Sequence, residues 1–280
     1  MDPNFITNPF LATQFPIKCS YLTDFSCAAS PINDLFVKLL CKNCPNIIRL
    51  GLPETDITDQ SISHIYKLIP KVEWLNFSNT NLTSSSLPIF IKFKKIEILS
   101  LSYCKKIVSP LPKFEVESDC PLSVLQMCWM STELSSKCVK NFVKSFQKLK
   151  RLNLSNMKQL EEKHLLKILS RSQEYIENLN LSFLEKLTDN TLDFMENLNN
   201  MTYLTLAHNK NYTAKKISEM ISRCSNLQRI ELTSTLVDNS VLEVIKDCEQ
   251  ICYVGLRNTK VNYTVCKKFF QNYPHLSYSF

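Results

Sequence analysis

The chain has 280 residues, 44% of them hydrophobic, and its 33 basic against 26 acidic side chains give a net charge of +7. The basic excess is modest and spread over predicted helices and turns, which disfavours binding to nucleic acid or to an acidic membrane. Only 2 glycines occur, Gly51 and Gly255, and each stands alone in a predicted strand. The glycine-rich phosphate cradles of nucleotide-binding folds are therefore excluded, and we expect both glycines to be small residues at exposed strand positions.

One sequence pattern, apolar-x-x-apolar-x-apolar, recurs along the chain at intervals of 24 to 27 residues. Its ten copies begin at Leu22, Ile47, Val72, Ile96, Leu122, Leu149, Ile176, Met201, Leu227 and Ile251. The interval lies in the range of leucine-rich repeats, so we predict an α/β leucine-rich-repeat solenoid of about ten repeats. A solenoid grows by adding repeats, so a chain longer than a usual single-core domain needs no larger core.

The first segment, residues 1–20, is predicted to be an N-terminal cap. Residues 1–16 contain three prolines and no lysine or arginine, unlike a secretory signal or a mitochondrial presequence. The chain also lacks an apolar run of about 18 residues, which a membrane span needs. We therefore expect a protein of the cytoplasm, or of the nucleus, that does not associate with membranes.

Residues 21–275 are predicted to form the solenoid, each repeat supplying a strand, a turn and a short helix. In Leu152-Asn153-Leu154 the apolar alternation has the period of a half-buried strand. A second apolar anchor follows each of eight strands: Ile57, Leu82, Ile107, Leu160, Leu187, Tyr212, Val237 and Val261. Runs with helical spacing, such as residues 61–69, come next. Stacking would give a curved horseshoe with a parallel sheet on the concave face and helices on the convex face.

Two regions depart from this scheme. The repeat that begins at Ile96 is predicted to lack a helix, because Pro110 and Pro112 lie next to an acidic stretch that contains Glu115 and Glu117. Residues 276–280 look like an eleventh strand that is cut short, so we expect a truncated terminal strand or a cap there.

Cysteines recur at fixed places in the repeats. Cys44, Cys224 and Cys248 stand three positions before the first apolar residue of a repeat, and Cys104 stands three positions after the last leucine of its strand. Most of the 12 cysteines fall where strands and helix ends should pack, which predicts buried free thiols. No second CxxC or histidine pair accompanies Cys41 and Cys44, so we predict no metal site and no cofactor. Seven Asn-x-Ser/Thr sequons are interpreted as a coincidence of composition, although they favour a secreted protein.

The dipeptides Thr58-Asp59 and Thr188-Asp189 complete the pattern, since both residue types cap helix N-termini. Together with the cysteines they resemble the cysteine-containing leucine-rich repeats of F-box proteins and of their F-box-lacking relatives. The resemblance covers roughly residues 20 to 276. It implies substrate recognition in a cullin-type (SCF) ubiquitin ligase, with ligase components among the partners. The residues before Leu22 are too few for an F-box, so two alternatives stay open: a stand-alone regulatory or assembly scaffold, and a secreted recognition domain.

Catalysis is not predicted. A hydrolase needs a nucleophile, a base and an orienting group in one pocket, and only four histidines are available. His64 and His164 fall in predicted helices, His208 follows a strand and His275 lies near the C-terminus. None of them has a nucleophile and a carboxylate beside it in the sequence, so we expect a protein that is not an enzyme.

The outward positions of the strands and turns are the predicted binding surface for a protein or peptide. Side chains alternate along a strand, so outward residues of successive repeats form rows across the sheet. The rows combine aromatic residues with arginines, which are enriched at protein interfaces, and Arg suits an acidic or phosphorylated segment. The predicted partner-binding residues are Trp74, Tyr103, Trp129, Phe183, Tyr203, Tyr253, Arg49, Arg151, Arg229 and Arg257. We expect Trp129 and Tyr103 to share one patch, because adjacent strands lie about 4.8 Å apart.

Overall fold

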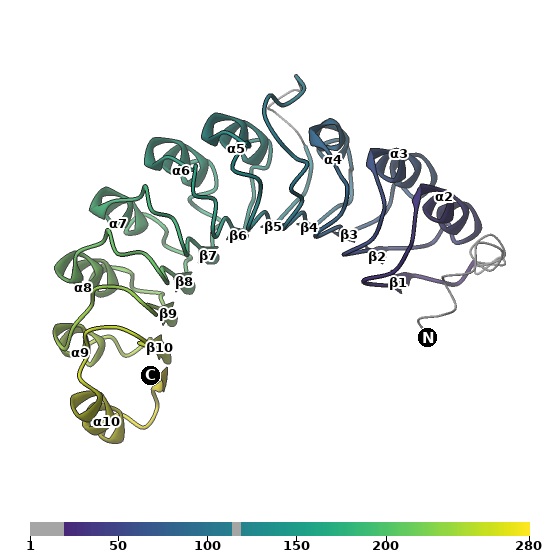
Figure 1. Ribbon diagram of the computed structural model, residues 1–280. Coiled ribbons are helices and arrows are strands. Elements are labelled where there is room, and N and C mark those ends of the chain that lie inside the picture. The colour runs from purple at the N-terminus through teal and green to yellow at the C-terminus, as the bar shows by residue number, and fades with distance from the viewer. Residues whose placement is uncertain (1–19, 114–118) are drawn as a thin grey trace. The chain divides into compact units, whose positions relative to one another are not determined.

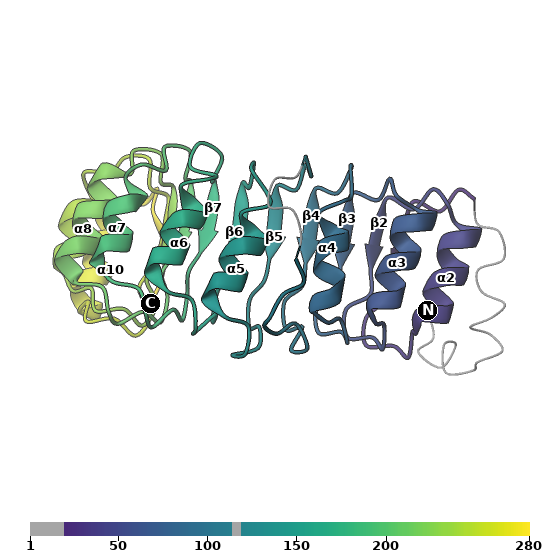
Figure 2. The same ribbon diagram turned by 90° about the horizontal axis from the view of Figure 1, so that it is seen from above.

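The computed structural model describes residues 20–113 and 119–280, which divide into two compact units between Lys148 and Leu149. Both units are built from the predicted repeat of strand, turn and short helix (Figure 1). In each unit the strands lie next to one another on one side, and the helices cover the other side (Figures 1 and 2). We call the exposed side of the strands the strand face. The cap predicted for residues 1–20 lies outside the described residues except for Ser20.

The first unit contains five described strands that pair in parallel and in chain order: β1 (Asp24–Ser26), β2 (Arg49–Gly51), β3 (Trp74–Asn76), β4 (Ile98–Ser100) and β5 (Val124–Gln126). Their first residues are in register with one another. The helices of this unit are α2 (Asp34–Asn43), α3 (Asp59–Leu68), α4 (Leu87–Phe90) and α5 (Ser136–Val143). A 3₁₀ helix, η2 (Ser84–Ser86), leads into α4.

The second unit continues the same order with β6 (Arg151–Asn153), β7 (Asn178–Asn180), β8 (Tyr203–Thr205), β9 (Arg229–Glu231), β10 (Tyr253–Gly255) and β11 (Ser277–Ser279). These strands also pair in parallel with aligned first residues. Its helices are α6 (Glu162–Leu169), α7 (Asp189–Met195), α8 (Ala214–Arg223), α9 (Ser240–Ile245) and α10 (Tyr263–Asn272). Residues 277–279 thus form a strand, while the boundaries at 20/21 and 275/276 remain predictions.

The core of each unit comes from the apolar positions of the repeat. The middle residue of a strand points inward, so Leu50, Leu75 and Leu179 have at most 1% of their surface exposed. The predicted second anchors are buried as well, from Ile57 at 0% to Val261 at 5%. Burying one such side chain contributes about 1.5–3 kcal/mol, and the repetition supplies several per repeat. The apolar spacing therefore fixes which side of every strand faces the helices.

Neighbouring repeats are joined by acidic residues at helix N-termini. Thr58 caps α3 as predicted, and Asp34 at the start of α2 accepts hydrogen bonds from the Thr58 N–H (2.8 Å) and hydroxyl (2.6 Å). Asp34 also accepts from the Ser61 N–H (3.1 Å) and hydroxyl (2.5 Å). Burial favours a higher pKa for Asp34, but these hydrogen bonds outweigh it and hold the pKa below its usual range. Asp59, Glu162 and Asp189 bind the following repeat in the same way.

A left-handed turn ends the strand segment of ten repeats. The residue two positions after the last apolar residue has a φ of +49° to +63°, although none of these residues is glycine: Ala29, Glu54, Asn79, Tyr103, Trp129, Asn156, Phe183, His208, Ser234 and Asn258. A backbone hydrogen bond joins one turn to the next, as from the Glu54 N–H to the Ser78 carbonyl (2.9 Å) and from the His208 N–H to the Thr233 carbonyl (2.8 Å). This ladder of hydrogen bonds extends each sheet beyond its strands and holds the turns in place.

The fourth repeat is irregular, as expected from its prolines. Residues 101–113 and 119–123, between β4 and β5, contain no helix. Pro110 and Pro112 lie in this stretch, whereas Glu115 and Glu117 fall outside the described residues.

Several sequons have a structural cause. Asn76, Asn153 and Asn180 each take the third position of a strand, and each side-chain oxygen accepts the N–H of the serine two residues later at 3.0 Å. This contact is an Asx turn, which asparagine favours over most residues. The geometry of the repeat therefore accounts for the asparagines of these three sequons, and the interpretation of the sequons as a coincidence of composition stays a prediction.

Candidate interaction surface

The predicted binding residues occupy two sets of positions on the strand face. Arg49, Trp74, Arg151, Tyr203, Arg229 and Tyr253 are the first residues of their strands, as the alternation predicted. Tyr103, Trp129 and Phe183 lie in the left-handed turns, and Arg257 directly precedes one. These placements fix where the side chains are, and their part in binding remains a prediction.

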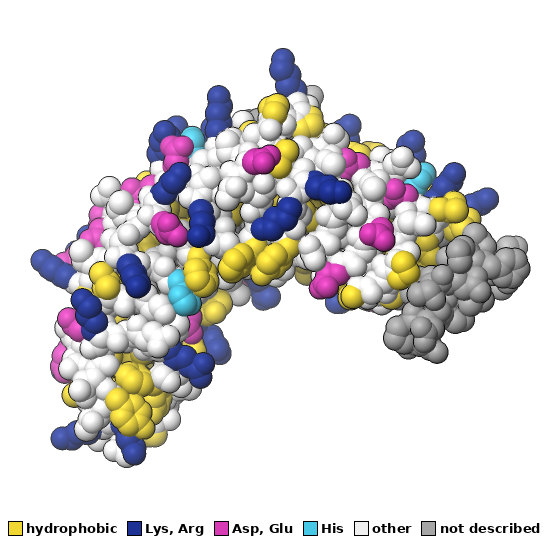
Figure 3. Space-filling view, in the orientation of Figure 1, with side chains coloured by type: hydrophobic (Ala, Val, Ile, Leu, Met, Phe, Trp, Pro, Cys, Tyr) yellow, Lys and Arg dark blue, Asp and Glu magenta, His cyan; other side chains and the backbone are white. Residues whose placement is uncertain are grey.

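Tyr103 and Trp129 form a stacked pair in the first unit. Their ring centroids are 5.8 Å apart and the planes differ by 7°, so the two predicted residues do share one patch. They remain 43% and 36% exposed, and hydrophobic side chains gather on this side of the molecule around β4 and β5 (Figure 3). The ammonium of Lys105 lies 5.8 Å from the Tyr103 ring centroid and donates to the Trp129 carbonyl. A cation thus borders the aromatic patch.

The backbone under this pair is strained. Tyr103 has a φ of +63° and Trp129 a φ of +57°, and a left-handed conformation costs an L-residue about 1–2 kcal/mol. Part of that cost is offset where the Tyr103 N–H donates to the Cys128 carbonyl at 3.0 Å. Glycine would remove the strain but also the ring. The same conformation recurs at eight other turns, so it belongs to the repeat and does not by itself mark a binding site.

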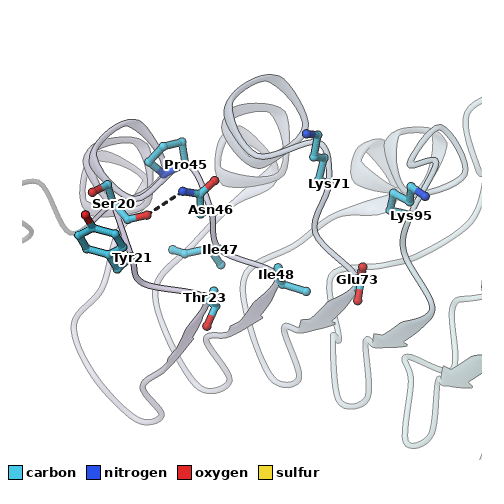
Figure 4. A pocket seen from close by; sticks show the side chains of 10 residues that line it. All are labelled: Ser20, Tyr21, Thr23, Pro45, Asn46, Ile47, Ile48, Lys71, Glu73 and Lys95. Atoms are coloured by element: carbon cyan, nitrogen blue, oxygen red, sulfur yellow. Dashed lines mark hydrogen bonds between the residues drawn. The ribbon is translucent and has the colours of Figure 1, made fainter.

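A polar groove adjoins the aromatic pair. It has a volume of about 330 Å³ and is lined by acidic Glu54 and Asp56, by basic Lys105 and Lys106, and by Tyr103. A larger pocket of about 470 Å³ lies at the opposite end of the strands, where Lys71, Glu73 and Lys95 line it (Figure 4). Both are open to solvent, so they suit surface contacts more than the enclosure of a small ligand.

Glycine positions are explained by large neighbours, and our expectation of exposed glycines is wrong. Gly51 is buried because the Trp74 ring lies over it, so that an added Cβ would stand 2.8 Å from Trp74 Cζ3. The guanidinium of Arg49 lies 5.6 Å from the Trp74 ring centroid and also pairs with Asp24 at 3.1 Å. Gly255 is buried under the carboxylate of Glu231, which would stand 2.0 Å from an added Cβ. Both glycines make room for side chains of the strand face.

Phe183 stacks on His208 in the second unit. The ring centroids are 4.0 Å apart and the planes differ by 9°, while His208 remains exposed. Sequence reasoning placed His208 just after a strand but did not select it for binding, because a single histidine there carries no distinctive signal. The spacing of 25 residues between two aromatic rings in equivalent turns could have revealed the pair.

The Tyr253 hydroxyl forms hydrogen bonds with residues of both neighbouring strands. Its hydroxyl lies 3.0 Å from Glu231 Oε2 and 3.1 Å from Ser279 Oγ. The guanidinium of Arg229 lies 4.8 Å from the Tyr253 ring centroid. Burial and, secondly, the charge of Glu231 raise the pKa of Tyr203. The structure therefore brings three of the predicted residues, Tyr203, Arg229 and Tyr253, together around Glu231, which the sequence reasoning missed.

The cysteines are free thiols at all eleven positions that the structure describes. Burial raises the pKa of Cys41 and of Cys224 to about 12, so these thiols stay protonated at neutral pH. Within residues 20–113 and 119–280, no group of three His, Cys, Asp or Glu side chains is placed to hold a metal ion. In the same residues no helix has the length and apolar character to cross a membrane.

Comparison with known proteins shows likeness at the level of fold. No family model matches the chain, and no curated protein sequence does. Among solved structures, an internalin from Listeria monocytogenes superposes with a TM-score of 0.56 at 13% identity, over 93% of this chain and 87% of that one. The Rad7 and Elc1 complex of yeast gives 0.47 at 16% identity, over 80% and 72% of the two chains. A leucine-rich-repeat protein of Leptospira interrogans gives 0.46 at 14% identity, over 87% and 74%. The chain is a leucine-rich-repeat solenoid of about ten repeats.

Proposed function

We propose that the chain is a protein-interaction module whose strand face binds a protein partner. The observation that carries this proposal is the stacked Tyr103–Trp129 pair, which is exposed on the strand face. Exposed aromatic patches beside cations are typical of protein interfaces, where a few aromatic and Arg residues supply most of the binding energy. The proposed role is binding rather than catalysis, which fits the placement of His64 and His164 in helices and of His208 against Phe183.

The test is capture of partners by the wild-type chain and by a Tyr103→Ala/Trp129→Ala variant, followed by affinity measurement with the purified partner. One hot-spot residue contributes about 2 kcal/mol or more, and the contributions of two stacked residues do not add, so we expect the double variant to bind at least about thirty-fold more weakly. The matched control is Tyr21→Ala/Tyr263→Ala, which removes two aromatic rings that are 96% and 58% exposed elsewhere. A partner that binds both variants as tightly as the wild type would refute the site.

The more specific function that we propose is substrate recognition for a cullin-type ubiquitin ligase. It is supported by the cysteine positions of the repeat, since Cys44, Cys104, Cys224 and Cys248 are all buried in the structure. The free thiols also favour the cytoplasm or the nucleus over a secreted location. Co-purification of a cullin and its F-box adaptor with the chain, together with accumulation of the captured partner when the chain is depleted, is the expected result.

A stand-alone scaffold is the alternative, and a separate observation favours it. The two units carry different aromatic clusters, Tyr103 with Trp129 in one and Phe183 with His208 in the other. Two unlike patches suit two partners. If each double alanine variant loses a different partner and no ligase component co-purifies with the wild type, the scaffold is the correct function and the ligase proposal fails.

A further inference from the structure

The strand face of the second unit carries arginines without acidic partners. Arg151, Arg229 and Arg257 are exposed, and the described residues place no carboxylate within ion-pair distance of them. Some other cations of this unit are paired, as Arg223 is with Glu196 and Lys150 is with Glu177 at 3.2 Å, whereas Lys267 and Lys268 on α10 have no ion pair among the described residues. The strand face of the second unit thus carries three arginines whose charge no described carboxylate pairs with.

The carboxylate on the same strand as Arg229 is already engaged in hydrogen bonds. Glu231 accepts hydrogen bonds from the Thr233 N–H (3.0 Å), from the Thr233 hydroxyl and from the Tyr253 hydroxyl (3.0 Å). Its carboxylate therefore orients neighbours instead of pairing with Arg229. The positive charge of Arg229 is left available to a ligand.

Arg229 is held in place by a series of contacts. Its guanidinium lies over the Tyr253 ring, and the Tyr253 hydroxyl is fixed by Glu231 and by Ser279. Glu231 fits there because position 255 is glycine, with no Cβ to displace the carboxylate. A guanidinium stacked on a ring keeps its N–H edge free for bidentate hydrogen bonds to a carboxylate. The arrangement prepares Arg229 before any ligand arrives, which lowers the entropic cost of binding.

We propose that the strand face of residues 149–280 binds an acidic protein segment, with Arg229 as the central carboxylate anchor and Arg151 and Arg257 as flanking cations. The inference rests on the proposed binding function and names the chemistry of the partner. The stack of half-buried Phe183 on exposed His208 offers an aromatic surface on the same face for one apolar side chain of the segment. The partner is thus an acidic segment that also carries an aromatic or aliphatic residue.

The spacing of the arginines predicts the spacing of the acids. Arg151 on β6 and Arg229 on β9 are three strands apart, or about 14 Å at 4.8 Å per strand. An extended segment that crosses the strands advances about 3.4 Å per residue, so carboxylates about four residues apart reach both arginines. A segment with acidic residues at that interval should bind better than one with the same acids side by side.

A protein segment fits this face better than nucleic acid does. Nucleic-acid affinity comes mainly from many phosphate contacts, and the described residues of this face offer only three arginines along it. Phe183 stacks on His208 and the Tyr253 ring lies under Arg229, so one face of each of these rings is already covered. Displacement of the peptide probe by RNA is nevertheless measured as an outcome that would overturn the proposal.

The experiment measures fluorescence anisotropy of short labelled peptides with the full chain. One peptide has glutamates four residues apart with a phenylalanine between them, one has the same glutamates adjacent, and one has glutamine at each glutamate. We expect the spaced acidic peptide to bind at least about tenfold more tightly than the glutamine peptide, which corresponds to one charge-assisted anchor. Arg229→Ala should abolish that advantage, and Arg229→Lys should keep only part of it because lysine cannot bind a carboxylate bidentately.

A second test asks whether the orientation of Arg229, and not only its positive charge, contributes to binding. Gly255→Ala displaces Glu231 and should weaken the acidic peptide about as much as Arg229→Ala, while the double variant should lose little more. If the two substitutions instead lower the peptide affinity additively, Gly255 does not act through Arg229. Lys215→Ala, which removes a helix-side cation, is the matched charge control and should change nothing.

The outcomes distinguish this inference from the proposed function. Equal binding of acidic and glutamine peptides, or displacement by RNA at lower concentration than by free acidic peptide, overturns the inference. If in that case the natural partner is still lost from the Tyr103→Ala/Trp129→Ala variant, the interaction module stands without it. If the acidic peptide binds through Arg229 but no partner depends on the first unit, the proposed site fails and the inference stands.

Discussion

The contact of Asp34 with the next repeat gives a stability prediction that can be worked out from the structure. Asp34→Ala removes four hydrogen bonds and leaves the N–H groups of Thr58 and Ser61 without that acceptor. A hydrogen bond to a charged group contributes about 1.5–3 kcal/mol, but bonds to one carboxylate are not additive and this one is partly solvated. The lost negative charge at the N-terminus of α2 adds a few tenths of a kcal/mol, so we expect Asp34→Ala to lower the free energy of unfolding by about 3 kcal/mol.

The assay is urea unfolding followed by tryptophan fluorescence. Trp74 and Trp129 are the 2 tryptophans of the chain, and both lie in the first unit with Asp34, so their signal reports on that unit. The matched control is Asp56→Ala, another acidic residue of the same unit whose exposed side chain lines the polar groove. Asp56→Ala should lower the free energy of unfolding by less than about 0.5 kcal/mol.

The pH dependence of the Asp34 effect follows from its lowered pKa. A carboxyl that is more acidic in the folded than in the unfolded chain adds stability above its usual value of 3.8 and loses it as the pH falls through the folded value. The difference between wild type and Asp34→Ala should therefore be full at neutral pH and shrink below about pH 4. A cost under about 1 kcal/mol at neutral pH, or a cost that does not change in acid, would refute the reasoning.

Three other predictions concern single residues. Asn209→Ala should destabilise the second unit by about 3 kcal/mol, measured by hydrogen exchange, because this buried side chain bonds two backbone groups of the preceding repeat at 2.7 Å each. Gly51→Ala should push the ring of Trp74 outward and shift its fluorescence to the red, and an unchanged spectrum would contradict the packing. A maleimide should label exposed Cys252 in the native chain, whereas buried Cys224 should react only on unfolding, as peptide mapping can show.

Much of the fold could be predicted because it depends on apolar spacing. The period of the pattern places Leu50 and its equivalents inward, and that choice fixes the register, so Arg49 and Trp74 had to lie next to each other on the strand face. The N-cap of α3 at Thr58 could also be predicted from the sequence, since threonine suits the N-terminus of a helix. These features need only local sequence and the geometry of stacked strands.

The turns and the clusters could not be predicted in the same way. A left-handed conformation is normally signalled by glycine or asparagine, and here Tyr103, Trp129 and Phe183 adopt it because backbone hydrogen bonds between repeats impose it. The role of Glu231 depends on Gly255 and Tyr253, which lie one strand away and more than 20 residues later in the sequence. Contacts of this kind appear only when the repeats are placed in space.

In the left-handed turns, the backbone conformation does not depend on which side chain is present. Because the hydrogen bonds between turns involve only main-chain atoms, residues as different as Ala29, Glu54 and Trp129 occupy equivalent positions without a change of conformation. Recognition can therefore be altered at one repeat while the neighbouring repeats keep their structure. A library that varies only these turn residues would explore new specificities on an unchanged scaffold, and its members should differ in what they bind far more than in how they fold.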